Sequence, residues 1–543
     1  MSMAGGRAEV MTGGEAADTR SRGLWTVAIG VIVYIVLHAG FRLLASDVLG
    51  EDDTLEQIMV QELRLGYEAR QPPLYDWVLY SVQRLTGPSV VSFLAIKYAA
   101  LLATALLIYT AAFRILADRL WALLTVESLA LIYQIAWRYH EGFTHEVLAM
   151  VAVAATLNAF LRLYDHGRWS DYLLFGVIAG LGLLTEPNFA VYQLCLWGAA
   201  LLLADVRRRI RSAPLVAAFA LALAIASPYL LWLLSDPAHW NEIFQPSLRG
   251  WVGDRLVGAK DALRGPIMYL LPLVAILPAV FPGYLATAAA DVRRLATLRS
   301  SRAAEAAEIA DDPASGSTLE LLVLATLLLG IVWSLIGGMA LGIGGYAMHV
   351  LMPLYVTSII WLMGVAKRSP RAALRMPVFA KLALGIAVLA LLVRLANMFV
   401  LDPVCGKCRW GIPYDGLASA LRAEGVSETT TFLAVDDELA GNLRQHFPAA
   451  RFVLIGPRRF MPDGVDLMRD GLTFVWDPAA KGVTGLPAML AGNTGRRPSL
   501  AEGKALEVPW RHLWRPEGYR TSQWRMLPIP PSLNAAEPLT SGR

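Results

Sequence analysis

The apolar residues of this chain are gathered into blocks long enough to cross a bilayer as helices. A spanning helix needs about 20 apolar residues, and on this basis we predict about eleven spans. Their approximate ranges are 24–46, 91–113, 120–137, 146–163, 171–185, 189–205, 213–234, 266–290, 319–341, 346–364 and 379–400. Thr185-Glu186-Pro187-Asn188 interrupts one apolar stretch. Because proline ends a helix and Glu and Asn are costly in hydrocarbon, we expect a turn there, at the membrane edge.

The pattern changes after residue 401, where no block is long enough to span a membrane. Residues 431–435, 451–455 and 472–476 have the composition of strands, and residues 437–447 have that of a helix. The β-α-β order predicts a small α/β domain. We therefore expect a polytopic α-helical membrane protein with a short tail (1–23), a membrane domain (24–401) and a C-terminal α/β domain (402–543).

The charged residues define an orientation. Of the 543 residues, 56% are hydrophobic and 17% are charged, whereas soluble domains carry about 25% charge. Basic residues cluster in five predicted loops, at 114–119, 162–168, 207–211, 293–302 and 367–375. With the N-terminus in the cytoplasm, all five loops lie inside and the C-terminal domain lies outside. The net charge of the whole chain is only +4, and the basic residues are distributed among these loops. This distribution argues against a nucleic-acid partner.

The first outer loop holds the most promising acidic cluster. Asp52 and Asp53 stand four and three residues before Glu56, a spacing that places carboxylates on one helix face. Clustering raises the pKa of at least one carboxyl, and such a group suits a general base. The alternative is a helix start, where negative charge is favourable. The following segment, 71–77, is either a membrane-surface helix or part of a substrate site.

The second outer loop, 138–146, contains two histidines and two glutamates. His140 and His145 are five residues apart, which is not the spacing of a helical zinc site, so we predict no metal ligands and leave a divalent cation open as a cofactor. Hydrogen bonding or acid–base chemistry is the favoured role. His349 lies within an apolar block, as either a functional group or a packed histidine.

Two cysteines follow the last apolar block. Cys405 and Cys408 form a C-x-x-C pair, while Cys195 lies in an apolar block and supplies no second ligand pair for zinc. Outside the cytoplasm, the pair is expected to form a short disulfide. A redox-active pair is the alternative.

Taken in order, several motifs resemble the bacterial GT-C glycosyltransferases of the family 39/83 type, which include the aminoarabinose and galacturonic acid transferases of lipid A and relatives of the protein mannosyltransferases. The motifs are Asp52-Asp53 with Glu56-Gln57, Leu65-Gly66-Tyr67, Gln71-Pro72-Pro73-Leu74-Tyr75, Thr144-His145, Gly180-Leu181-Gly182-Leu183-Leu184 with Asn188-Phe189, Cys405-Gly406-Lys407-Cys408 and Ala440-Gly441-Asn442-Leu443-Arg444. In this chain Gln71 stands where the aminoarabinose transferases have lysine.

The resemblance implies a polyprenyl-phosphate sugar donor in the bacterial inner membrane and an envelope acceptor, which is lipid A or lipopolysaccharide, another glycan, or a protein. It places the catalytic aspartate in the first outer loop. Asp52 is the first choice and Asp53 the second, with Glu56 and Glu141 as further catalytic carboxylates. The substrate-binding candidates are Gln57, Gln71, Tyr75, Arg138, His140, His145, Glu186, Asn188 and His349.

The competing function is a transporter or flippase for a lipid-linked sugar or a solute. A transport path is expected to carry paired ionisable groups near the middle of the membrane. In this sequence the ionisable groups gather at the predicted outer edge, which favours the enzyme.

Overall fold

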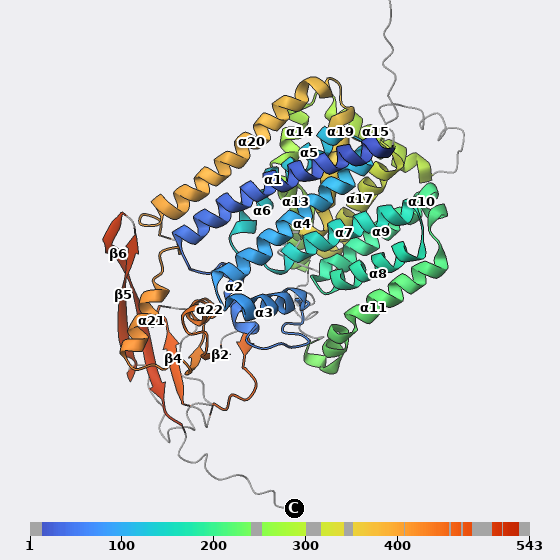
Figure 1. The fold of residues 1–543 in the computed structure, drawn as a ribbon. Helices are drawn as coiled ribbons and strands as arrows, with labels where there is room; N and C mark the ends of the chain where they lie inside the picture. Colours follow the sequence, from blue (N-terminus) through green and yellow to red (C-terminus); the bar gives the residue numbers. More distant parts are fainter. Residues whose placement is uncertain are drawn as a thin grey trace, which may run out of the picture.

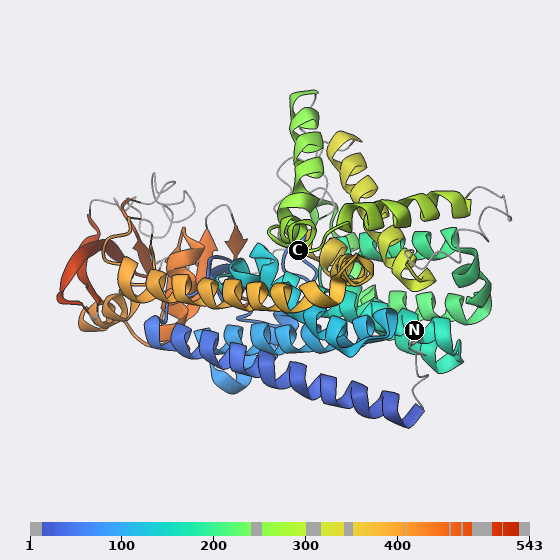
Figure 2. The same ribbon diagram turned by 90° about the horizontal axis from the view of Figure 1, so that it is seen from above.

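The computed structural model describes residues 13–239, 252–299, 316–340, 351–406, 408–455, 458–467, 471–479, 502–512 and 514–531. Long helices form a bundle, and a sheet domain packs at one end of it (Figure 1). The view from above shows α1 and α20 running lengthwise toward this domain (Figure 2). The protein is therefore a mostly helical membrane protein with a small C-terminal strand-containing domain, as the sequence predicts.

The membrane part contains long and broken helices. The long helices are α1 (Gly13–Ala45), α4 (Val90–Leu116), α7 (His145–Asp165), α8 (Trp169–Leu183), α9 (Pro187–Leu202), α11 (Ser212–Ser235), α13 (Val252–Leu270), α17 (Thr318–Ala340) and α20 (Ala372–Ala396). The shorter ones are α5 (Arg119–Glu127), η1 (Ser128–Leu131), α6 (Tyr133–Ala136), η2 (Arg138–His140), α10 (Ala204–Arg209), α14 (Leu273–Val280), α15 (Tyr284–Arg299), α18 (Met352–Tyr355), η4 (Val356–Ser358), α19 (Ile359–Arg368) and η5 (Asn397–Leu401).

The described helices include six that are long and apolar enough to cross a membrane, and the bent pair α14–α15 would make a seventh. The segment predicted to span at 120–137 is divided into α5, η1 and α6. The segment predicted at 346–364 lies partly outside the described residues. The total of about eleven crossings therefore remains a prediction. The predicted turn near residue 186 is confirmed, because α8 ends at Leu183 and α9 begins with Pro187 in its first turn.

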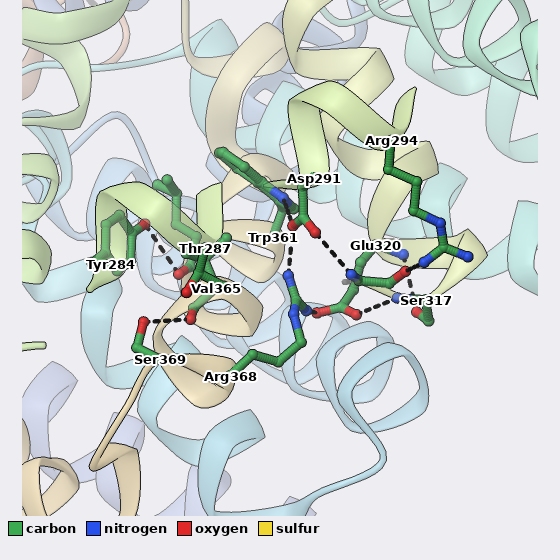
Figure 3. A network of polar contacts seen from close by, with 12 residues as sticks. Tyr284, Thr287, Asp291, Arg294, Ser317, Glu320, Trp361, Val365, Arg368 and Ser369 are labelled. Atoms are coloured by element: carbon green, nitrogen blue, oxygen red, sulfur yellow. Dashed lines mark hydrogen bonds and ion pairs between the residues drawn. The ribbon is translucent and has the colours of Figure 1, made fainter. Parts of the chain in front are cut away.

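A buried ion network joins α15, α17 and α19 (Figure 3). The Arg368 guanidinium reaches both Asp291, at 2.5 Å, and Glu320. Asp291 is fully buried and also accepts hydrogen bonds from the Trp361 indole N–H at 2.9 Å and from the backbone N–H of Gly316 at 2.8 Å. Arg368 of α19 thus pairs with carboxylates of α15 and α17, which fixes the three helices relative to one another.

The C-terminal domain is built on a mixed sheet with the strand order β3-β2-β1-β4-β6-β5. Its elements are α21 (Tyr414–Ala423), β1 (Thr431–Ala434), α22 (Asp437–His446), β2 (Arg451–Ile455), β3 (Arg459–Phe460), β4 (Leu472–Trp476), β5 (Lys504–His512) and β6 (Arg515–Ile529). Strands β1, β2 and β4 are parallel, and β6 pairs antiparallel with both β4 and β5. The three predicted strands and the predicted helix are confirmed, while the long β5–β6 hairpin was not predicted.

Two short helices lie between the bundle and the C-terminal domain (Figure 1). These are α2 (Glu51–Met59) and α3 (Leu74–Thr86), both from the loop that follows α1. The backbone of α22 approaches that of α2 so closely that a Cβ atom on Gly441 would lie 2.3 Å from the carbonyl oxygen of Thr54. Glycine at position 441 thus permits the contact between the domain and the first loop.

We predict that Arg368→Met destabilises the protein markedly, because the substitution leaves two buried carboxylates without their cation. Removing one partner of a buried ion pair typically costs about 3–5 kcal/mol. The unfolding temperature of the purified protein in detergent measures the effect. Arg293→Gln, on the exposed face of α15, is the matched control and should leave this temperature nearly unchanged. Equal unfolding temperatures for the two variants would show that the network does not hold the helices together.

Candidate active site

The acidic cluster of the first loop forms the start of α2. Gly50 precedes the helix, and its backbone N–H donates to Asp53 Oδ2 at 3.2 Å. Three acidic residues occupy the first turn, where the helix dipole favours negative charge. All residues from Asp53 to Met59 are buried. The predicted helical face therefore exists, and most of it points into the protein.

Asp53 is held in a buried ion pair with Lys97 of α4. The Lys97 ammonium lies 2.7 Å from Asp53 Oδ1 and 2.8 Å from Oδ2, and both side chains are at least 95% buried. Both carboxylate oxygens are therefore occupied by a membrane helix. The negative charge of Asp53 is therefore compensated inside the protein, and neither of its oxygens is left for another partner.

Asp52 is in a different situation from its neighbour. Its side chain is half-buried, and no ion pair of Asp52 is found within the described part of the chain. Burial, followed by the negative charges of Glu146 and Asp53, raises the pKa of Asp52 to about 7. A carboxyl with this pKa exchanges protons near neutral pH, as a general base must.

The second loop packs directly onto the start of α2. A Cβ atom on Gly50 would lie 2.1 Å from the carbonyl oxygen of Glu141, so only glycine permits this approach. Arg138 bridges the two segments: its guanidinium lies 3.0 Å from Glu141 and 3.6 Å from Glu51. Glu141 of the second loop therefore lies beside the start of α2 in the first loop, and its carboxylate is paired with Arg138.

One helical turn beyond Asp52, Glu56 meets side chains from two other helices. Glu56 Oε1 lies 3.3 Å from His145 Nε2, and Asp76 Oδ2 lies 4.0 Å from the same nitrogen. The Tyr75 ring packs beside the imidazole, with 5.3 Å between ring centroids. The sequence grouped Glu56, Tyr75 and His145 as site residues, and the structure brings them together. Glu56, Asp76 and His145 could also hold a metal ion.

His140 lies behind this site, in the interior of the bundle. Its ring nitrogens contact the hydroxyl groups of Tyr34, at 2.7 Å, and Tyr98, at 3.0 Å. The ring also stacks on His38, with 4.1 Å between centroids. Arg394 of α20 donates to the His140 carbonyl oxygen at 2.8 Å. His140 is 3% exposed, so its position is that of a packed and hydrogen-bonded histidine.

The C-terminal domain covers α2 through the motif 440–444. Asn442 Oδ1 accepts a hydrogen bond from the backbone N–H of Leu49 at 2.8 Å. Arg444 donates to the carbonyl oxygen of Gln57 and, at 3.1 Å, to Gln83 Oε1. Gln57 also accepts from Gln83 at 2.6 Å. The side chain of Gln57, a predicted substrate contact, is therefore fully buried under the domain.

The predicted substrate-binding residues not yet placed are Gln71, Glu186, Asn188 and His349. Gln71 is half-buried next to Pro72, whose carbonyl oxygen lies 3.1 Å from His145 Nδ1. Glu186 is buried at the turn before α9, with Asn188 two residues on, and the turn meets α3 through a bond from the Leu74 N–H to the Leu184 carbonyl oxygen. His349 lies outside the described residues.

The two cysteines after α20 form a disulfide, with 5.3 Å between their Cα atoms. It lies close to the junction between the bundle and the domain, where Arg520 of β6 donates to the Cys405 carbonyl oxygen at 3.1 Å. The hydrogen bond connects the disulfide to β6, which makes a local structural role for it the favoured interpretation.

Sequence reasoning missed three ionisable residues near the site, namely Lys97, Asp76 and Arg394. Lys97 and Arg394 stand inside apolar blocks predicted to span the membrane. A charged residue within such a block is costly unless it has a partner. That rule, applied to every block, would have singled out both cations. Asp76 sat among the aromatic residues of 71–77 and carried no comparable signal.

Comparisons with known proteins agree with this architecture. Residues 70–232 match the model of the dolichyl-phosphate-mannose-protein mannosyltransferase family. The chain is 28% identical to the lipopolysaccharide core galacturonosyltransferase RgtB of Rhizobium johnstonii over 500 residues, which cover 90% of this chain and 94% of that protein. It is also 26% identical to the lipid A galacturonosyltransferase RgtD of the same organism over 232 residues, or 40% and 46% of the two chains.

A solved structure shows the same fold. The crystal structure of ArnT from Cupriavidus metallidurans bound to undecaprenyl phosphate superposes with a TM-score of 0.57. The match covers 91% of this chain and 97% of that chain, at 14% sequence identity. The arrangement of membrane helices and C-terminal domain is therefore shared between the two proteins.

We predict that Lys97→Met destabilises the protein by about 3–5 kcal/mol, because it leaves the Asp53 carboxylate buried and unpaired. Adding Asp53→Asn should recover most of this loss, since the uncompensated charge is then removed. Unfolding of the single and double variants measures the coupling.

The matched control for this cycle is the exposed ion pair between Lys504 and Glu424. Lys504→Met should cost about 1 kcal/mol or less, because solvent screens exposed pairs. A Lys97→Met protein as stable as the parent would show that Asp53 does not depend on Lys97 for its charge.

Proposed function

Because this chain is a membrane glycosyltransferase with the GT-C fold, we propose that it transfers a uronic acid from a polyprenyl-phosphate donor to lipid A or the lipopolysaccharide core. The observation that carries the mechanism is the contrast within α2. Asp53 is neutralised by Lys97, while Asp52 is half-buried, without an ion pair among the described residues, and has a pKa near 7. Asp52 is thus the general base.

In the proposed reaction, Asp52 accepts the proton of an acceptor hydroxyl group. The hydroxyl oxygen bonds to C1 of the donor sugar as the bond between C1 and the phosphate oxygen breaks. The electron pair leaves with the polyprenyl phosphate, so the products are the glycosylated acceptor, the lipid phosphate and a protonated Asp52. Base catalysis of this kind contributes about 10²–10⁴-fold to the rate.

Cations at the start of α2 are placed to receive the charge of the leaving phosphate. Arg138 lies 3.6 Å and Arg409 4.0 Å from the exposed Glu51 carboxylate. Arg138 comes from the second loop and Arg409 from the segment after the disulfide. We assign to these guanidinium groups the binding of the donor phosphate, because arginine matches phosphate geometry well. The polyprenyl phosphate part of the proposed donor is supported by the solved relative, whose crystal structure contains bound undecaprenyl phosphate.

The five basic loops support an orientation in the bacterial inner membrane with the N-terminus in the cytoplasm. In this orientation α2, α3 and the C-terminal domain lie on the periplasmic face, where lipopolysaccharide is modified. Uronic acid as the sugar follows from the names of the relatives, which are galacturonosyltransferases acting on the lipopolysaccharide core and lipid A.

A cleft at the end of the bundle is suited to an anionic lipid acceptor. It lies between the end of α1, the η5 segment that follows α20, and the β5–β6 hairpin, and it has a volume of about 530 Å³. Leu44, Met398 and Phe399 form an apolar side, and Arg511 and His512 supply polar and basic groups. The lining also includes the buried carboxyl of Asp402, which accepts a hydrogen bond from Tyr519. Acyl chains and phosphate groups occur together in lipid A, and this lining offers a partner to each.

We predict that the purified protein in lipid nanodiscs converts polyprenyl-phosphate galacturonic acid and lipopolysaccharide acceptor into glycosylated product. Asp52→Asn should lower this rate about 10²–10⁴-fold, because the variant cannot accept the proton. Mass spectrometry of the acceptor measures the product, and lipopolysaccharide from a deletion strain should lack the same sugar.

The matched control is Asp415→Asn, which changes an exposed carboxyl of α21 and should leave transfer intact. Donor binding by Asp52→Asn should persist. If Asp52→Asn transfers sugar at the parent rate, the base lies elsewhere. If the protein moves a labelled donor lipid across the bilayer and forms no product, it is the flippase that the sequence left as an alternative.

We predict that kcat/KM rises with pH through a midpoint near 7, the pKa of Asp52. The carboxylate is the active form and its pKa is raised, so activity is lost as the pH falls. At pH 6 the rate should be about one tenth of its value at high pH. Glu146→Gln removes a negative charge that raises this pKa, so the midpoint should move to lower pH. A flat profile between pH 6 and 8 would exclude Asp52 as the titrating base.

A further inference from the structure

We propose that Glu56, Asp76 and His145 bind a divalent transition metal, with zinc as the best-matched ion. The three residues come from α2, α3 and the first turn of α7. Each is more than 95% buried. One potential ligand atom from each lies within 4.8 Å of the other two. The site therefore joins three separate elements around a single point in the interior.

The spacing of the ligand atoms suits a small cation. Atoms bound to zinc at about 2.0–2.2 Å and at tetrahedral angles stand about 3.3–3.6 Å apart. The Nε2 atom of His145 lies 3.3 Å from Glu56 Oε1 and 4.0 Å from Asp76 Oδ2. The first distance already fits, and the second needs a movement of less than an ångström by one side chain.

The tautomer of His145 is fixed in the form that metals require. Its Nδ1 atom lies 3.1 Å from the carbonyl oxygen of Pro72, which can only accept a hydrogen bond. Nδ1 therefore carries the proton, and in the neutral ring Nε2 presents its lone pair to the carboxylates. A backbone carbonyl behind the ligating imidazole is the usual second contact of a metal-bound histidine.

The charges around the site also call for a cation. Within the described part of the chain, no lysine or arginine pairs with Glu56 or Asp76, and His145 is the basic side chain that lies within 4.0 Å of both. Lys97, which lies beside the start of α2, is already paired with Asp53. Asp76 Oδ1 is buried and has no hydrogen-bond partner, which is costly for a carboxylate oxygen. A divalent ion would compensate both carboxylates at once and could bind the second oxygen of Asp76.

One imidazole and two carboxylates make a mixed ligand set, which zinc accepts readily. Three protein ligands leave a fourth position to water. The ion would link α2 to α3, both from the first loop, and would attach them to α7. Because Glu56 is one turn after Asp52, the metal would also fix the rotation of α2 and hence the direction of Asp52. This makes the metal ligands positioning residues, and their metal binding does not depend on the proposed sugar or acceptor.

The test is the metal content of the full-length protein, purified in detergent without chelator and measured by elemental mass spectrometry. We expect one zinc ion per chain. A chelator should remove the ion and lower the unfolding temperature. Added zinc should restore both the metal content and the unfolding temperature. The parent protein loaded with cobalt in place of zinc should show the visible absorption of a four-coordinate site. This measurement tests the proposal without any substitution.

Glu56→Gln and His145→Gln should each lose the ion. Glu141→Gln, a neighbouring carboxylate outside the ligand set, should retain it. A folded parent protein that contains no metal and does not bind added zinc or cobalt would overturn the proposal and leave the two carboxyls sharing a proton beside His145. Zinc retained by both ligand variants would place the ion elsewhere and overturn it equally. Sugar transfer is measured separately, so a failure of the metal proposal can be told apart from a failure of the proposed function.

Discussion

The ion pair between Asp53 and Lys97 is the contact on which the rest of the site depends. It joins a short loop helix to a long membrane helix through a charge that neither could bury alone. With Asp53 fixed, the neighbouring Asp52 is left half-buried. Glu56, one turn after Asp52, then faces α3 and α7. One buried lysine thus gives the carboxylates of the acidic cluster different environments, and the environment of a carboxylate decides its pKa.

The first loop is enclosed from two sides. The bundle contributes Lys97 and His145, and the C-terminal domain contributes Gly441, Asn442 and Arg444. Asn442 accepts a hydrogen bond from the backbone N–H of Leu49, just before α2, and Arg444 donates one to the carbonyl oxygen of Gln57, near its end. The helix is short and would be unstable alone, so its conformation is set by its neighbours. The site therefore belongs to the interface between membrane part and domain as much as to the loop that carries it.

Much of this arrangement is readable from local patterns, and the rest depends on contacts between distant segments. The three-and-four spacing of Asp52, Asp53 and Glu56 predicted a common face, and Pro187 marked a turn, because both are properties of neighbouring residues. The partner of each carboxylate was not predictable, since Lys97 and Asp76 reach the site only through tertiary packing. The β5–β6 hairpin was missed although buried and exposed positions alternate along β5, and the broken helices at 119–136 read as one apolar block.

The close contact between Gly441 and Thr54 has a consequence for how the protein is made. The two segments are separated by nearly four hundred residues, as the bond from Leu49 to Asn442 illustrates with a separation of 393. Ribosomes add about 5–20 residues per second, so α2 is synthesised roughly 20–80 seconds before the segment that covers it. During this interval α2, with its catalytic candidate, lacks the contacts that the C-terminal domain supplies. A chain that ends before residue 441 would therefore have the first loop and the bundle but would lack one side of the enclosure around α2.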